Sequence, residues 1–296
     1  MIGESEGAMT IDDLLGRHAT LGIRRFGSPG ALLAVNEKEE VLLPGAEIPE
    51  GAAIGDEVDV FIYLDSEARP IATTRVAKLE LGEVAFLEVT ELTRFGAFVD
   101  WGMPKELLVP FAEQTADMRP GTRYAIGLYL DDSGRFAGTM KVSEMLDRAR
   151  REGHGRDVQW QVDEWVDGEA WRNDPEIGLF VIVERAFVGL VPATEPHSLT
   201  RGQAARFRVT NILPDGRIEL SLRKHAHEEL ADDANAILAA LRRPDAPRIG
   251  DRSSPDAIRD AFGISKKAFK RAVGRLLKER AVVIGPDGTI SIAPTR

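Results

Sequence analysis

Two phenylalanines, Phe95 and Phe98, are spaced so that they could stack on the bases of a nucleic acid strand. They enclose a glycine and an alanine in a run that otherwise has the alternation of a β-strand. Exposed aromatic rings bind unpaired bases by stacking, and each stacked base contributes about 1–3 kcal/mol. Basic side chains contact the phosphates of such a strand. The nearest candidates for these contacts are Arg94, Lys105 and Arg123.

Whether the two rings can act together depends on the face of the strand that each one occupies. Residues three apart on a regular strand point to opposite faces of the sheet. Glycine within a strand often marks a β-bulge, which inserts one residue and resets the alternation. We therefore predict a bulge at Gly96 that brings Phe95 and Phe98 onto one exposed face. In the alternative, one ring belongs to the core and the other is half-buried packing.

The segment around Phe180 offers a second surface of the same kind. Phe180 follows a glycine by two residues, as Phe98 does, although an isoleucine replaces the first aromatic residue. Farther along, Arg206 and Arg208 alternate with Phe207, which places both arginines on one face of a strand. We predict that these arginines contact phosphates. A solvated basic face without a ligand is the alternative.

Residues 265–280, SKKAFKRAVGRLLKER, predict an amphipathic helix with a basic face. Four of the basic residues recur at intervals of four, four and three, so they share one face, and two more flank them. A basic recognition helix docks in the DNA major groove in many helix-turn-helix proteins. The same face could bind an RNA backbone, or it could bind no ligand. The absence of Asn and Gln from this helix argues against recognition of individual bases. The six residues are Lys266, Lys267, Lys270, Arg271, Arg275 and Lys278.

The elements that position the aromatic residues come from an internal repeat of three copies. In each copy a glycine lies 14 residues before a proline, and a second glycine then opens an alternating run. A turn such as DSGR or PDGR and one more short run complete a copy of about 60–70 residues with about five strand-like runs. Five short strands cannot bury a face as a flat open sheet, so a closed barrel is predicted. The pairs are Gly30 and Pro44, Gly96 and Pro110, and Gly178 and Pro192.

The C-terminal region changes to a helical period. An apolar pattern in DDANAILAALRR predicts one helix, and Ser254 followed by Pro255 marks the start of a second. Ser265 caps the basic helix. Two short strands, AVVI and TISI, are then joined by the hairpin turn GPDG. This order of helices followed by a β-hairpin predicts a winged helix.

Composition limits the possible classes of protein. The chain has 296 residues, 43% of them hydrophobic and 29% charged, which is typical of a soluble globular protein, and no run approaches the ~20 apolar residues of a membrane helix. The absence of cysteine excludes disulfides and thiolate metal sites and fits a reducing cytoplasm. The acidic N-terminal segment lacks the apolar core of a signal peptide, so a cytoplasmic location is expected.

Charge is distributed unevenly along the chain. The net charge of −10 argues against a simple basic nucleic-acid binder, yet residues 226–296 hold 13 Lys and Arg against 10 Asp and Glu. The first copy of the repeat is acidic and has Leu32 and Leu33 where aromatic residues would stack. We predict that this copy is a structural or protein-contacting barrel.

The repeat resembles the S1 domain, an RNA-binding module with the OB fold. The resemblance rests on G-x-F-V, on a strand ending in L-x-V-P, and on the segment from the second glycine to D-x-G-R. It is strongest in the second copy, moderate in the third and weak in the first. Where many S1 domains have His-Ile-Ser after the strand, the second copy has Val109, Pro110 and Phe111, so one familiar polar contact is missing.

Three such barrels followed by a winged helix resemble the conserved virulence factor B family of bacterial RNA-binding regulators. The most specific segment is GAFVDWGMPKELLVPFAEQ. This resemblance implies RNA binding, a role in post-transcriptional gene regulation and no catalytic activity. We expect a mostly β protein with a C-terminal α+β domain: three tandem S1/OB-fold five-stranded β-barrels followed by a winged-helix domain. The expected domains are residues 1–76, 77–145, 146–225 and 226–296.

Enzyme motifs are absent from the sequence, which has no G-x-x-x-x-G-K-[ST], G-x-S-x-G or H-E-x-x-H. His225 and His227 are two residues apart and would not share a helix face, so neither a metal site nor a cofactor is expected. The tryptophans Trp160, Trp165 and Trp171 are assigned to core or edge packing.

Single-stranded RNA is the expected partner, bound by a monomer that does not associate with membranes. Two alternatives stay open on the sequence. The chain could be an adaptor that binds the ribosome or RNA polymerase through its acidic barrels, or a DNA-binding regulator that uses the winged helix.

Overall fold

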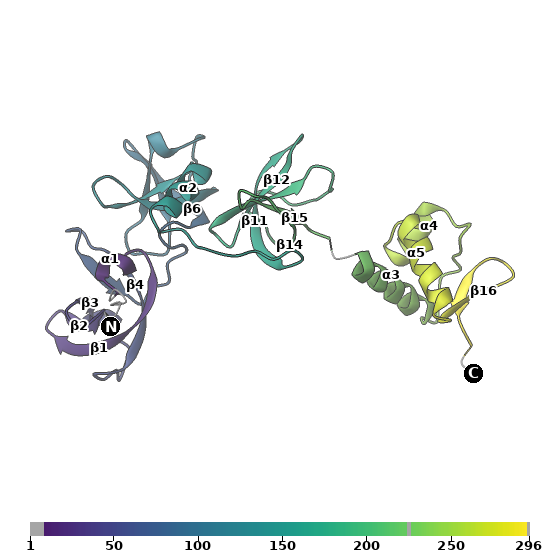
Figure 1. The fold of residues 1–296 in the computed structure, drawn as a ribbon, viewed down its shortest axis with the longest axis horizontal. Coiled ribbons are helices and arrows are strands. Elements are labelled where there is room, and N and C mark those ends of the chain that lie inside the picture. Colours follow the sequence, from purple (N-terminus) through teal and green to yellow (C-terminus); the bar gives the residue numbers. More distant parts are fainter. Residues whose placement is uncertain (1–8, 224–225, 295–296) are drawn as a thin grey trace, which may run out of the picture. The chain divides into compact units, whose positions relative to one another are not determined.

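The computed structural model describes residues 9–223 and 226–294, which belong to two compact units, Met1–Ser221 and Leu222–Arg296 (Figure 1). The described part of the first unit consists of three five-stranded groups in chain order. The described part of the second unit is helical with a two-stranded sheet. The predicted fold class, mostly β with S1-like barrels and a C-terminal winged helix, is confirmed.

The first and third groups are closed barrels in which the first strand pairs with the second and the fourth, and the fifth strand closes the ring against the third. Barrel 1 follows the short helix α1 (Ile11–Leu14) and comprises β1 (His18–Gly27), β2 (Gly30–Ala34), β3 (Glu40–Pro44), β4 (Glu57–Leu64) and β5 (Pro70–Thr73). Barrel 3 comprises β11 (Trp165–Asp174), β12 (Gly178–Val183), β13 (Phe187–Pro192), β14 (Ala204–Ile212) and β15 (Ile218–Ser221). The closing strand is parallel in both barrels, as five-stranded Greek-key barrels require.

Barrel 2 has the same strand order, but its last strand is not hydrogen-bonded into a ladder with its third. Side chains of β8 instead pack against β10 at Gly138, where an added β-carbon would lie 2.9 Å from Val109 Cγ2. A backbone hydrogen bond from Met140 N to Glu113 O at 2.9 Å also holds this edge. The strands are β6 (Val84–Thr93), β7 (Gly96–Asp100), β8 (Leu107–Pro110), β9 (Arg123–Leu130) and β10 (Phe136–Thr139).

The spacing of glycine and proline in the repeat has a direct structural meaning. Each glycine opens the second strand of its barrel and pairs with the proline that ends the third: Gly30 with Pro44, Gly96 with Pro110 and Gly178 with Pro192. A β-carbon at these glycines would lie 2.0–2.2 Å from a carbonyl oxygen of the third strand. The strands therefore cross too closely there for any other residue.

A second repeated contact closes each barrel, and it was not recognised in the sequence. The glutamate three residues after the proline accepts a hydrogen bond from a buried hydroxyl at the end of the fifth strand. In barrel 2 the distance from Thr139 Oγ1 to Glu113 Oε2 is 2.6 Å. The other pairs are Thr73 with Glu47 at 2.5 Å and Ser221 with Glu195 at 2.7 Å.

Neighbouring barrels of the first unit share apolar contacts. Phe61 of barrel 1 is fully buried in the core of barrel 2, where its ring lies edge-on to Trp101 at 6.0 Å. Between barrels 2 and 3 lies α2 (Val142–Arg151), a helix that the sequence analysis did not predict. Its Leu146 joins a cluster with Phe86 of barrel 2 and Ile182 of barrel 3.

The second unit has the predicted winged-helix elements. Ser254 and Ser265 cap their helices by accepting hydrogen bonds from the backbone three residues on, and Gly263 ends α4 in the left-handed conformation. Phe262 and Phe269 stack at 5.4 Å in the core between these helices. The elements are α3 (Ala226–Leu241), α4 (Pro255–Phe262), α5 (Lys266–Lys278), β16 (Val282–Ile284) and β17 (Ile290–Ile292).

Candidate nucleic-acid interface

Phe95 and Phe98 both lie outside the core of barrel 2, but the predicted bulge is not at Gly96. Phe95 occupies the two-residue turn between β6 and β7 and is 58% exposed. Phe98 lies on the outer face of β7, half-buried, between the buried residues Ala97 and Val99. The register shift occurs in β6, between Val89 and Glu91. The prediction of a bulge at Gly96 was therefore wrong. The glycine at this position instead allows β7 and β8 to approach each other closely.

The turn residue Arg94 adds a cation to this end of the hairpin. Its guanidinium lies over the Phe95 ring, 4.7 Å from the centroid. Phe111, which takes the place of a polar residue in the expected motif, is 59% exposed and lies directly after Pro110, the partner of Gly96. Three apolar rings therefore remain accessible on barrel 2.

Phe98 lines a groove of about 610 Å³ between the outer face of barrel 2 and the β4–β5 turn of barrel 1, which we call the barrel-2 groove. Lys105 and Arg135 contribute cations to the lining. The loop that carries Lys105 is fixed because Trp101 Nε1 donates a hydrogen bond to the Lys105 carbonyl oxygen at 2.6 Å. Two of the four carboxylates in the lining, Asp65 and Glu67 of barrel 1, pair with Arg69 at 2.8 and 2.9 Å. The surroundings are still acidic, because Glu106 and Asp131 add to them and the four carboxylates outnumber these three cations.

Phe180 occupies the equivalent position on barrel 3 and lines a groove of about 430 Å³, which we call the barrel-3 groove. The guanidinium of Arg172 lies 4.5 Å from the Phe180 centroid and 5.6 Å from that of Trp171. Helix α2 forms one wall of this groove. Its lining balances three arginines (Arg150, Arg172 and Arg217) against three carboxylates (Asp147, Asp215 and Glu219).

The comparison of the two linings favours barrel 3 as the better site for a polyanion. An acidic rim repels phosphates, whereas a neutral rim with an arginine stacked on the aromatic platform can neutralise them. Arg135 and Arg217 occupy the same position in the two repeats, in the DSGR and PDGR turns. The sequence indicated these turns but no role for their arginines, and it favoured packing as the role of Trp171.

Arg123, predicted as a phosphate contact, does not line the barrel-2 groove. Its guanidinium donates hydrogen bonds to the Phe86 carbonyl oxygen from Nε at 3.1 Å and from Nη2 at 2.9 Å. It therefore lies on the side of barrel 2 that faces barrel 3.

Arg206 and Arg208 alternate with the fully buried Phe207, as predicted, but they do not accompany Phe180 in the barrel-3 groove. Arg208 Nη1 lies 2.6 Å from a carboxylate oxygen of Asp163, and its side chain is 14% exposed. Arg206 lies 3.6 Å from Asp167 and lines a different cavity. Phe180, Arg206 and Arg208 therefore do not share one site, and Arg208 lines neither the barrel-3 groove nor this cavity.

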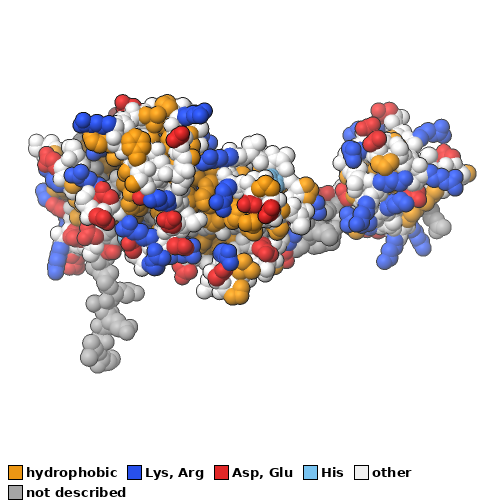
Figure 2. Space-filling model, turned by 90° about the horizontal axis from the view of Figure 1, so that it is seen from above, with side chains coloured by type: hydrophobic (Ala, Val, Ile, Leu, Met, Phe, Trp, Pro, Cys, Tyr) orange, Lys and Arg blue, Asp and Glu red, His pale blue; other side chains and the backbone are white. Residues whose placement is uncertain are grey.

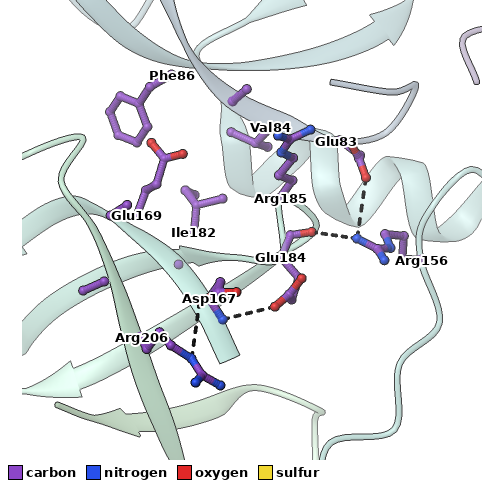
Figure 3. A pocket seen from close by; sticks show the side chains of 14 residues that line it. Glu83, Val84, Phe86, Arg156, Asp167, Glu169, Ile182, Glu184, Arg185 and Arg206 are labelled. Carbon is purple, nitrogen blue, oxygen red and sulfur yellow. Dashed lines mark hydrogen bonds and ion pairs between the residues drawn. The ribbon is translucent and has the colours of Figure 1, made fainter. Parts of the chain in front are cut away.

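That cavity, of about 630 Å³, lies between barrels 2 and 3 and is lined by charged side chains that pair with one another (Figure 3). Arg156 contacts Glu83 at 3.7 Å and donates a hydrogen bond to the Glu184 carbonyl oxygen at 3.1 Å. Val84 N donates to the Arg185 carbonyl oxygen at 2.7 Å. These contacts join barrel 2 to the β12–β13 turn, so the cavity is part of the joint between the barrels.

One carboxylate of the joint is incompletely paired. Glu169 points towards the Phe86 ring (Figure 3), and its Oε2 is buried without a hydrogen-bond partner. Burial raises the pKa of Glu169 above its ordinary value, and the positive charges of Arg123 and Arg185 oppose that rise.

Barrel 1 differs from the other two as the sequence suggested. Leu33 is fully buried and Leu32 is half-buried, so neither offers an aromatic platform. The exposed ring of this barrel is that of Phe26, in β1. The arginines nearest to it, Arg24 and Arg25, are both paired with Glu40.

The six predicted basic residues of α5 fall into two groups. Three are engaged within the unit: Lys266 Nζ donates to the Ser253 carbonyl oxygen at 2.8 Å, Lys270 pairs with Asp251 at 2.9 Å, and Arg275 pairs with Glu279 at 2.7 Å. The other three, Lys267, Arg271 and Lys278, are exposed. Within residues 226–294 they form no ion pair, and we call these three the basic face.

No group of three or more His, Asp or Glu side chains in the described residues is arranged to hold a metal ion. His225 lies outside the described residues, and the side chain of His227 is likewise not described. None of the helices in residues 9–223 and 226–294 is long and apolar enough to cross a membrane.

Comparison with known proteins agrees with this architecture. Residues 15–75 and 81–141 match the S1 domain family, and residues 235–290 match the CvfB-like winged helix domain. The chain is 30% identical over 281 residues to the uncharacterized protein YitL of Bacillus subtilis (strain 168), covering 90% of each chain. It is 27% identical over 237 residues to conserved virulence factor B of Staphylococcus aureus (strain N315), covering 78% of each.

A solved structure also resembles the chain. It is a multidomain protein with nucleic acid binding domains from Streptococcus pneumoniae TIGR4, 25% identical, with a TM-score of 0.38 and coverage of 94% of this chain and 98% of the other. The third barrel lies outside the residues that match the S1 family. Its likeness to the first two rests on strand order and on the repeated glycine, proline and glutamate contacts.

Proposed function

Because this chain belongs to the conserved virulence factor B family, we propose that it binds single-stranded RNA in the cytoplasm, as a monomer, and regulates gene expression after transcription without catalysing a reaction. The S1 domains and the winged-helix domain support nucleic-acid binding.

The observation that carries the proposal is the equivalent placement of Phe98 and Phe180. Each ring lies on the outer face of its barrel and lines a groove, of about 610 Å³ for Phe98 and about 430 Å³ for Phe180. OB-fold barrels bind single strands on this face by stacking bases on aromatic side chains. A duplex would offer only its backbone to such a groove, because its bases are already stacked and paired.

Barrel 3 supplies the stronger of the two contacts in this proposal. The guanidinium of Arg172 lies 4.5 Å from the centroid of the Phe180 ring, so a base that binds at this platform meets a planar cation beside the aromatic ring. Arg217 at the rim pairs with Asp215 at 2.8 Å and is 74% exposed, which leaves its guanidinium within reach of a phosphate. In the barrel-2 groove the cations Lys105 and Arg135 face an acidic rim.

The basic face of α5 provides a separate contact with the phosphate backbone. Lys267, Arg271 and Lys278 are exposed on one side of the helix and form no ion pairs within residues 226–294. Phosphate contacts position a nucleic acid without reading its sequence. Barrel 1, in which Arg25 and Arg69 are paired with carboxylates, acts as a structural or protein-contacting module.

Titration of a fluorescein-labelled single-stranded RNA with the full chain tests the proposal directly. Binding should weaken with salt, with a log–log slope of about −0.7 for each phosphate contact, and a duplex DNA of the same length should compete poorly. Preferential binding of duplex DNA would support the DNA-binding alternative. Absence of any binding at low salt would overturn the RNA proposal and favour a protein adaptor on the ribosome or RNA polymerase.

A further inference from the structure

An exposed glycine in the interior of α5, Gly274, has no role in the packing of its unit. Its φ is not positive, and the helix continues through it from Lys266 to Lys278. A β-carbon added at Gly274 would meet no other atom within 4 Å. Glycine is the least favourable helix-interior residue after proline, because it loses most backbone freedom on folding. The fold therefore gives no reason for a glycine at this position.

Along the helix axis, Gly274 lies between Arg271 and Lys278 of the basic face. Lys267, Arg271, Gly274 and Lys278 follow one another at intervals of four, three and four, and successive helical residues are rotated by about 100°, so these four fall within a sector of about 60°. Arg271 precedes the glycine by one turn and Lys278 follows it by one turn. The helix surface therefore has a gap between two exposed cations.

We propose that Gly274 is the point at which the sugar–phosphate backbone of an RNA strand comes closest to α5, with Arg271 and Lys278 contacting phosphates on either side. This inference rests on the proposed function and specifies how the strand meets the helix. Glycine is suited to such a position because a ligand can approach the main chain where no β-carbon intervenes. A longer side chain would hold the strand away from the helix and lengthen both flanking charge contacts.

The charge around Gly274 favours a polyanion over a protein surface as the occupant. The basic face carries three cations that are not paired within residues 226–294, and Lys and Arg side chains are gathered over this unit (Figure 2). A charged strand with phosphates at regular intervals matches several cations along one helix face. Within residues 266–278 no large apolar side chain is exposed that would anchor a protein partner.

The test compares Gly274→Ala and Gly274→Gln in the full chain with a matched control, Ala236→Gln, at an exposed position of α3. Two measurements are made on each variant: hydrogen exchange of the α5 amides, and affinity for fluorescein-labelled single-stranded RNA at several salt concentrations. Gly274→Ala should slow α5 exchange about threefold to fivefold, because alanine is the better helix former.

The same substitution should weaken RNA binding, so stability and affinity change in opposite directions. Gly274→Gln should weaken binding further, and the magnitude of its salt slope should fall by about 0.7 for each phosphate that the helix no longer reaches. Ala236→Gln should leave affinity and slope at the wild-type values. This combination supports the inference, because a purely structural role for Gly274 would not separate affinity from helix stability.

Other results would overturn it. If both Gly274 variants bind RNA as tightly as wild type, the inference fails and the proposed function stands. If affinity falls only where α5 exchange becomes faster, the effect is loss of the helix and the inference also fails. If wild-type protein shows no salt-dependent RNA binding, the proposed function and this inference fail together.

Discussion

Gly96 lies directly opposite Pro110 in the β7–β8 ladder, and a β-carbon on Gly96 would lie 2.2 Å from the carbonyl oxygen of Val109. The same crossing occurs in barrels 1 and 3, at Gly30 and Gly178. At this crossing the main chains of the two strands approach each other closely. The exposed turn that carries Phe95 lies directly before this crossing in the chain.

Substitution of Gly96 should therefore destabilise the first unit. Gly96→Ala places a methyl group against a main-chain oxygen, and the positive φ of 151° is also unfavourable for alanine. We expect a loss of more than about 2 kcal/mol in the free energy of unfolding, measured by urea titration. Gly22→Ala is the control, since Gly22 lies in β1 with open space around it. An equal loss in both variants would contradict the close-approach explanation.

The buried bond between Thr139 and Glu113 should contribute to closure of barrel 2. Thr139→Val keeps the shape of the side chain but leaves the Glu113 carboxylate without this donor, which should cost about 1–3 kcal/mol of unfolding free energy. Thr20→Val removes a bond of the same 2.6 Å length to Asp59 on the barrel surface. Urea titration should show a smaller loss for this exposed control. Equal losses would mean that burial of the bond has no effect.

Glu169 should make stability depend on pH in a definite direction. Because burial raises its pKa in the folded protein, the folded state holds its proton more tightly than the unfolded state. Stability is therefore lost as the pH rises from the ordinary glutamate pKa of 4.5 through the raised folded pKa. Glu169→Gln removes this loss. The melting temperature of the variant minus that of wild type should therefore be more positive at pH 7.5 than at pH 4.

Removing one carboxylate anywhere changes the net charge, so Glu169→Gln needs a reference. Glu176→Gln removes a charge at an exposed position of the same barrel. The melting temperatures of the two variants should diverge as the pH rises. Parallel curves across the whole range would show that burial of Glu169 has no thermodynamic effect.

The exposed cations of α5 should determine the salt dependence of RNA binding. Lys267→Ala/Arg271→Ala removes two phosphate contacts, so the magnitude of the log–log slope should fall by about 1.4. Arg242→Ala/Arg243→Ala removes the same charge from exposed positions after α3 and should leave the slope nearly unchanged. Fluorescence anisotropy at four salt concentrations measures both slopes. Similar slopes for the two variants would indicate a general charge effect.

Much of the architecture was predictable because the signals that specify it are local. The glycine-to-proline spacing marks a strand pair, and serine caps with a helical apolar period mark α4 and α5. Helix α2 was missed because its N-cap residue, Lys141, makes no side-chain capping bond. The bulge in β6 was misplaced because it depends on pairing with β7, which a single-strand pattern does not contain.

The candidate site was only partly predictable, for a related reason. Phe98 and Phe180 were found because the repeat places them two residues after a glycine. Trp171 was not assigned to the site because its place depends on α2, which forms the opposite wall of the groove. Arg208 was predicted to contact a phosphate, yet its Nη1 lies 2.6 Å from Oδ1 of Asp163, which is 45 residues away in the chain. Contacts between distant segments decide which charges can reach a ligand.

The most direct test of RNA binding on the barrels compares Phe98→Ala, Phe180→Ala and the double variant for affinity to single-stranded RNA, with Phe26→Ala, an exposed phenylalanine outside both grooves, as the control. Each groove substitution should cost about 1–3 kcal/mol of binding free energy at both low and high salt, with Phe180→Ala the more costly because Arg172 stacks on that ring. Circular dichroism should show an unchanged fold. If both single variants and the double variant bind RNA as Phe26→Ala does, the outer faces of barrels 2 and 3 are not the RNA platform.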